Sequence, residues 1–117
     1  EQLPLGPAWQ AFDEQERRFG VHAGEIETSM MLALNPEQVR MEMAQDCPSS
    51  AIERVQHHPL LGQGHSRLGW HVQDLHPSGA VGHARRADAA RGAALLDAVS
   101  DQLAVLLAQL IGFQALD

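Results

Sequence analysis

The hydrophobic pattern is clearest in the last third of the chain, where it predicts one long helix. From about Asp88 to Leu110 the large apolar residues recur at alternating spacings of three and four, namely Leu96, Val99, Leu103, Leu106 and Leu110. That spacing is typical of one face of an amphipathic helix. Asp88 is the expected N-cap and Gly112 the expected C-terminal stop. We expect the apolar face to be buried against a sheet or a second helix.

A second helix is predicted from about Gly24 to Asn35. Its apolar positions fall at i, i+4, i+7 and i+8, on Ile26, Met30, Ala33 and Leu34. Glu25 and Glu27 lie in the first turn, where the helix dipole favours negative charge. Pro36 ends the helix, because the residue before a proline avoids the right-handed helical region. Asn35 and Pro36 are then expected to open a short turn.

Three further segments carry strand signals. Residues 18–22 (RFGVH) form a strand candidate that would deliver His22 at its end, and residues 68–75 (LGWHVQDL) form a second candidate. Residues 39–45 (VRMEMAQ) alternate weakly and could be a strand or a helical segment. Helices that alternate with short strands predict an α/β fold. Because β-branched and aromatic residues are few, we expect part of an α/β sheet rather than a complete one.

The remaining segments are predicted to be short helical turns or loops. Residues 13–18 (DEQERR) are expected to be a charged, solvated turn of helix or loop, and residues 49–56 (SSAIERVQ) a helical turn or two. The stretches rich in glycine or proline, residues 3–9, 57–69 and 76–84, are expected to be extended or looped.

The composition limits the function classes. The 117 residues suit a single domain, residues 1–117, with one core. The net charge of −7, with histidine neutral, argues against a nucleic-acid partner, which requires a basic face. No apolar run reaches the roughly 20 residues that span a bilayer, so no membrane partner is predicted. The single cysteine, Cys47, is interpreted as an incidental loop thiol. Because it cannot form an internal disulfide, a cytoplasmic location is expected.

The histidines outside the second helix have weaker signals. His57, His58 and His65 lie close in sequence and raise the hypothesis of a metal-binding loop. Adjacent histidines do not easily face one ion, and no carboxylate or cysteine keeps ligand spacing with them, so we favour a solvated loop. His71 and His76 flank a candidate strand and are interpreted as surface positions, with a place in a crevice as the alternative.

The residues that carry chemistry are His22, Glu25 and Glu27, at the entry to the second predicted helix. A histidine that ends a strand and a glutamate in the next helix's first turn can converge on one crevice, where α/β sheets bind ligands. The helix N-terminus would keep Glu27 ionised, as a metal ligand must be, and His22 could transfer a proton. The alternative is structural: the carboxylates serve the helix dipole and His22 is a satisfied, partly buried side chain.

These residues resemble a known family. Residues 22–39 (HAGEIETSMMLALNPEQV) are similar to the HxGxxETSxxLxLxPxxV signature of the creatininase, or creatinine amidohydrolase, family. Residues 69–96 resemble the closing segment of that family, with the corresponding positions in order at Trp70, Gly79, Gly82, Gly92 and Leu95. The resemblance runs from about Phe19 to Leu110.

The resemblance implies part of a three-layer α/β/α fold and a metal-dependent hydrolase of amide C–N bonds. Family members hold divalent metal, zinc or manganese and commonly two ions, and many are oligomers. On the family motif, His22 would be the catalytic acid/base group, Glu27 a metal ligand, and Gly24 a place of close substrate approach. Trp70 is a core or oligomer contact, or a wall of the substrate site.

The sequence also departs from the family. The other metal ligands lie earlier in family members, in an E-x-H motif, a following aspartate and an N-G-H-G-G-N type loop, and the sequence contains none of these. The chain therefore resembles the C-terminal half of the family domain alone. Gly82, His83 and Ala84 stand where the family often has G-D-P.

Three functional hypotheses follow. The first is a metal-dependent amidohydrolase of a small-molecule amide, completed by the missing N-terminal part or by a second chain. The second is a catalytically incomplete fragment or assembly module, which associates with itself or with a partner through its apolar helix faces. The third is a small histidine-rich metal-binding module. The sequence does not identify the substrate.

Overall fold

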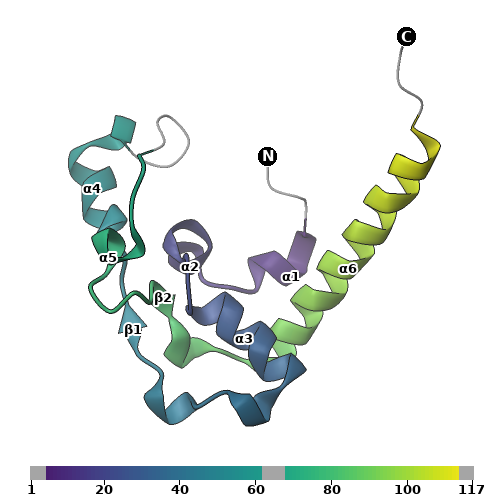
Figure 1. Cartoon of the computed structure of the whole chain (residues 1–117), viewed down its shortest axis with the longest axis horizontal. Helices are drawn as coiled ribbons and strands as arrows, with labels where there is room; N and C mark the ends of the chain where they lie inside the picture. The colour runs from purple at the N-terminus through teal and green to yellow at the C-terminus, as the bar shows by residue number, and fades with distance from the viewer. Residues whose placement is uncertain (1–4, 62–67, 114–117) are drawn as a thin grey trace.

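The computed structural model describes residues 5–61 and 68–113, and helices dominate this part of the chain (Figure 1). The α-helices are α1 (Gly6–Gln10), α2 (Glu14–Phe19), α3 (Glu25–Leu34), α4 (Ala51–His57), α5 (Val72–Leu75) and α6 (Ala89–Gly112). The 3-10 turns are η1 (Pro36–Gln38), η2 (Met41–Met43), η3 (Pro59–Leu61) and η4 (Ala84–Arg86). The strands are β1 (Asp46–Cys47) and β2 (Gly82–His83). The two predicted helices are thus confirmed as α3 and α6.

Helix α3 crosses the first turns of α6 at very short range, and two small buried residues allow this. A Cβ atom added to Gly92 of α6 would overlap the carbonyl oxygen of Ser29 in α3. Ser29 is fully buried, and its Oγ accepts a hydrogen bond from the Asp88 amide at 2.9 Å. Asp88 caps α6, because its Oδ1 accepts the amide proton of Arg91 at 2.8 Å. The predicted N-cap is therefore confirmed.

The sheet of the described residues is one short antiparallel pair. Strands β1 and β2 align Asp46 with His83 and Cys47 with Gly82. His22 adds an isolated bridge to Val81, whose amide donates to the His22 carbonyl oxygen at 2.7 Å. These bonds fix the segment that leads into α3 to the segment that leads into β2.

The two strand predictions are wrong. Residues 18–22 begin as the end of α2, because Asp13 starts that helix by accepting the Gln15 amide at 2.9 Å. Residues 68–75 contain α5, where Asp74 Oδ2 accepts the His71 amide at 2.8 Å in a capping box. Residues 39–45, for which the sequence left strand and helix open, contain the turn η2.

The hydrophobic core of the described residues is small. Its buried apolar members are Phe12, Cys47, Leu75, Val81, Ala84 and Leu95. The most buried residues of α3 are Glu25 and Ser29, whereas Leu34 of its predicted apolar stripe is exposed. The contact between α3 and α6 therefore depends on polar and small residues as well as on apolar ones.

The second half of α6 extends away from the body of the protein (Figure 1). On its predicted apolar face, Leu103, Leu106 and Leu110 are 51%, 42% and 58% exposed. The expectation that this face is buried is wrong for the described residues, because none of their elements covers it. The radius of gyration is 16.7 Å, whereas a compact domain of this length has roughly 13 Å.

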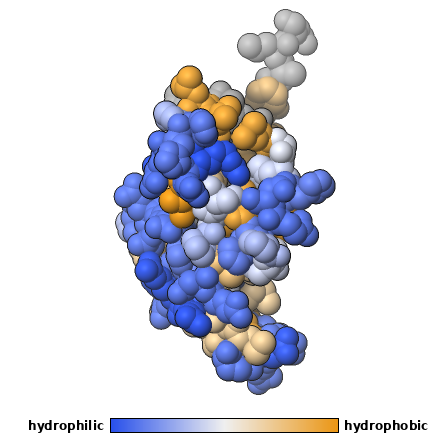
Figure 2. Space-filling view, turned by 90° about the vertical axis from the view of Figure 1, so that its left-hand side faces the viewer, coloured by the Kyte–Doolittle hydropathy of each residue, from blue (hydrophilic) through white to orange (hydrophobic). Residues whose placement is uncertain are grey.

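Two surface features complete the description. Among the described residues, α6 is long and apolar enough to cross a membrane by length and composition, a test that core helices of soluble proteins also pass. The face on the α4 side is mainly hydrophilic, with hydrophobic side chains gathered toward its upper end (Figure 2).

Candidate functional site

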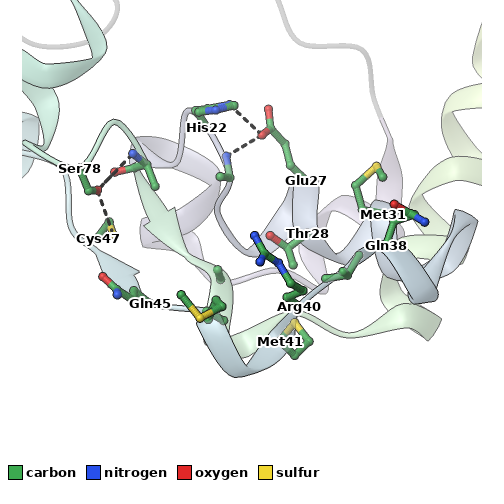
Figure 3. Close-up of a pocket in the computed structure, with 16 residues that line it drawn as sticks. His22, Glu27, Thr28, Met31, Gln38, Arg40, Met41, Gln45, Cys47 and Ser78 are labelled. Carbon is green, nitrogen blue, oxygen red and sulfur yellow. Dashed lines mark hydrogen bonds and ion pairs between the residues drawn. The ribbon is translucent and has the colours of Figure 1, made fainter.

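A pocket of about 540 Å³ opens beside the start of α3 (Figure 3). Its lining combines side chains from α3, from the η1–η2 segment, and from β1 and the loop before β2. Those used below are His22, Glu27, Thr28, Met31, Arg40, Met41, Met43, Cys47 and Ser78. A volume of this size suits a small molecule.

His22 and Glu27 meet in this pocket. Nδ1 of His22 lies 3.3 Å from Oε2 of Glu27, and both side chains are about half exposed or more. The two side chains thus converge as expected, although His22 follows an extended segment rather than the predicted strand. The contact with Glu27 favours the tautomer with the proton on Nδ1. Nε2, which has no protein partner among the described residues, then keeps its lone pair.

Glu27 also holds a strained backbone. Ala23 has a φ of 53°, in the left-handed region that residues other than glycine rarely adopt. The Ala23 amide donates to Glu27 Oε2 at 2.6 Å, a reach-back bond typical of an acidic residue in the first helical turn. Oε1 of Glu27 has no protein partner in the described part of the chain. A ligand can therefore approach Oε1 while Oε2 keeps Ala23 and His22 in place.

Glu16 organises the site from behind. Residues 13–18 were expected to be a charged, solvated turn of helix or loop. Residues 14–18 lie in α2, but Glu16 is only 2% exposed and therefore not solvated. Its carboxylate accepts the amide protons of Glu25 at 2.7 Å and of His83 at 2.8 Å. Because the N-cap of α3 is Gly24, which has no side chain, Glu16 supplies the missing acceptor. Glu16 thereby fixes the start of α3, from which Glu27 projects.

Gly24 and Trp70, the two residues expected near substrate, do not line this pocket. Gly24 is buried, and a Cβ atom there would overlap the Glu16 carboxylate and lie 3.0 Å from the Cα of Gly82. This packing is sufficient to require a glycine. Trp70 is 48% exposed, in the segment that precedes α5.

Glu25 does not join His22 and Glu27 at the pocket. It is 1% exposed, and its Oε1 pairs with the guanidinium of Arg91 in α6. Arg91 also donates to the carbonyl oxygens of Ala11 and Arg86 and lies over the ring of Phe12. Sequence reasoning missed Arg91. Glu25 lies in the first turn of α3, as expected, but it also has a charged partner in the interior of the protein.

The remaining candidate residues are structural or exposed. His57 and His58, at the end of α4, are exposed, and His65 lies outside the described residues. Cys47, expected in a loop, is buried in β1, where its sulfur accepts a hydrogen bond from Ser78 at 3.5 Å.

The described residues do not by themselves fit a complete metal centre. Within residues 5–61 and 68–113, no three histidine, cysteine, aspartate or glutamate side chains lie close enough together to hold an ion. His22 and Glu27 are donors of the kinds that zinc and manganese accept, but a zinc site takes about four ligands. Any metal centre here needs ligands from beyond these residues.

Sequence reasoning missed the methionine residues of the pocket. Met31, Met41 and Met43 line the pocket with thioether side chains, and Arg40 lines it as well. The signal in the sequence was weak. Met41 and Met43 are separated by one residue and follow the turn that begins at Pro36, and this arrangement is not a known binding motif.

Comparisons with known proteins add to this geometry. The family model described as Creatininase, creatinine amidohydrolase, matches residues 5–107. The fold matches a crystal structure of a Bacteroides fragilis protein assigned as a creatinine amidohydrolase, with a TM-score of 0.69 and 23% sequence identity. That match covers 97% of this chain and 42% of the other, so the chain spans less than half of this structural relative. The search of curated proteins found no match.

Proposed function

The chain belongs to the creatininase family, and on that premise we propose that it forms the C-terminal part of a metal-dependent amidohydrolase. In this reaction water adds across an amide C–N bond: the hydroxyl joins the carbonyl carbon and a proton joins the departing nitrogen. The observation that carries the proposal is the pairing of His22 with Glu27 in a pocket of small-molecule size. The substrate is a small-molecule amide.

In this proposal His22 is the acid/base group. Its Nε2 accepts a proton from the attacking water and returns it to the leaving nitrogen, while Glu27 Oε2 holds Nδ1–H. Glu27 is also a metal ligand through Oε1, and the other ligands come from outside the described residues. A bound zinc or manganese ion would polarise the amide carbonyl and activate water.

The experiment measures hydrolysis of creatinine and of simple acyclic amides by the protein assembled with the part that supplies the remaining metal ligands. The assembled protein is freed of metal and then supplied with Zn²⁺ or Mn²⁺. Glu27→Gln keeps an acceptor for the Ala23 amide but removes the charge, so we expect a loss of about 100-fold. His22→Asn should lose about 100-fold or more. Glu53→Gln, on the exposed side of α4, is the matched control and should keep the parental rate. A parental rate in Glu27→Gln would remove Glu27 from the mechanism.

One observation favours a second function. The exposed face of α6, together with the incomplete set of metal donors, fits an assembly module that associates with itself or with the missing N-terminal part. On this alternative the protein supplied with metal hydrolyses none of the amides and sediments as a stable oligomer.

A further inference from the structure

Arg40 differs from the other described arginines because its charge has no partner. The sequence has eight arginines, of which Arg67 lies outside the described residues. Six of the remaining seven make a hydrogen bond, an ion pair or a ring contact: Arg17, Arg18, Arg54, Arg85, Arg86 and Arg91. Among the described arginines, Arg40 alone has a guanidinium that makes none of these contacts, although its backbone carbonyl accepts the Met43 amide. A guanidinium left without a partner is available to a ligand.

The position of Arg40 points that charge at the candidate site. Its side chain lines the same pocket as His22 and Glu27, and in Figure 3 it extends toward Thr28, on the side where Glu27 lies. It forms no ion pair with Glu27. The pocket therefore holds an unpaired cation in a chain whose net charge is −7.

We propose that Arg40 binds a carboxylate of the substrate, so that the pocket takes amides that carry a negative charge near the C–N bond, such as N-acyl amino acids. A planar guanidinium matches a carboxylate in a two-pronged hydrogen-bonded pair, which gives orientation as well as attraction. This inference rests on the proposed amidohydrolase function and narrows its substrate class.

The rest of the pocket wall suits the apolar part of such a molecule. Met31, Met41 and Met43 offer flexible thioether side chains that adapt to different apolar shapes. The volume of about 540 Å³ lies within the range of small-molecule pockets. A carboxylate held by Arg40 would leave the amide free to reach His22 and Glu27, in the same pocket.

The test uses N-acetyl-leucine and its neutral counterpart N-acetyl-leucinamide, which has the same shape without the charge. Calorimetric titration into the metal-free protein should give a dissociation constant about tenfold lower for the acid, the usual size of a hydrogen bond to a charged group. Arg40→Gln should remove this preference. Arg18→Gln makes the same charge change outside the pocket and should keep it.

Circular dichroism first establishes that each variant is folded like the parent. Equal binding of acid and amide by the parent, no detectable binding of the acid, or a preference that survives in Arg40→Gln would overturn the proposal. Because the titration needs neither metal nor turnover, its result is separate from that of the hydrolysis assay. A preference for the acid that persists in a hydrolytically inactive protein would support Arg40 while the amidohydrolase function fails.

Discussion

Arg91 of α6 is paired with the carboxylate of Glu25 at the start of α3, and this buried ion pair joins the two longest helices. The Glu25 side chain is 1% exposed, and its Oε2 has no hydrogen-bond partner among the described residues. Glu25 therefore depends on Arg91 for compensation of its charge. A buried charge that loses its partner is strongly destabilising, whereas replacing both partners by apolar residues is much less so.

Replacing Arg91 alone should therefore destabilise the protein severely. We expect Arg91→Met to lower the free energy of unfolding in urea by about 3–5 kcal/mol, or to abolish folding if the parent is less stable than that. The double variant E25M/R91M should recover a large part of this loss. An unchanged urea midpoint in Arg91→Met would show that Glu25 does not need the guanidinium.

The crossing of α3 and α6 predicts a contrast between two glycines. Gly92→Ala places a methyl group against the Ser29 carbonyl oxygen, so we expect a loss of about 1–3 kcal/mol or more, as for other overpacked sites. At Gly112, at the open end of the same helix, a new methyl group would meet no described atom within 4 Å apart from the neighbouring backbone of α6 itself. Gly112→Ala should be neutral or stabilise by up to about 1 kcal/mol through helix propensity. Thermal unfolding of both variants measures the difference, and equal midpoints would contradict the close crossing.

The bond between Glu27 and the Ala23 amide predicts a stability effect that is separate from catalysis. Glu27→Ala removes the acceptor and should cost about 1 kcal/mol, as for a lost helix cap. Glu27→Gln keeps an oxygen acceptor and should cost clearly less. Glu53→Ala in α4 is the exposed control and should stay within about 0.5 kcal/mol of the parent. If both Glu27 variants unfold like the parent in urea, Oε2 does not hold Ala23.

The exposed half of α6 predicts self-association of the chain when it is studied alone. Leu103 and Leu107 are 51% and 50% exposed and lie four residues apart on one helical face. We expect the parent to sediment as a concentration-dependent oligomer and L103Q/L107Q to shift toward the monomer without loss of helical circular dichroism. Binding to phosphatidylcholine vesicles in place of oligomerisation would indicate that this face meets lipid.

Leu95, a buried residue of the same helix, serves as the comparison for the exposed residues Leu103 and Leu107. Leu95 is 2% exposed where α6 meets the body of the protein. Leu95→Ala should lower the free energy of unfolding by about 2–5 kcal/mol, the usual cost of a cavity in a core. If Leu95→Ala shifted the sedimentation of the chain toward the monomer and left the free energy of unfolding unchanged, the division of α6 into a packed and an exposed half would be contradicted.

The helices were predictable because their periodicity and caps are local signals, as Asp88 and Pro36 illustrate. The strand predictions failed because short apolar stretches such as residues 68–75 do not distinguish a strand from a capped helical turn. Glu16 had only a weak signal: it lies three residues before Phe19 in α2, which places its carboxylate on the same helical face as that apolar side chain.

The candidate site was predictable only in its central pair. His22 and Glu27 lie five residues apart, so their approach follows from the local chain direction into α3. The rest of the pocket is lined by residues that are distant in the sequence, such as Arg40 and Ser78. No pattern of spacing in a single sequence indicates that such residues line one pocket. The partner of Glu25 was missed for the same reason, since Arg91 is 66 residues away.

The two hydrogen bonds accepted by Glu16 also limit how far the protein can be shortened. A truncated version that starts at Gly20 would retain the candidate dyad, the imidazole of His22 and the carboxylate of Glu27. It would, however, leave the amides of Glu25 and His83 without their shared acceptor. The smallest segment able to orient that dyad therefore begins before α2, even though no side chain of α2 lines the pocket.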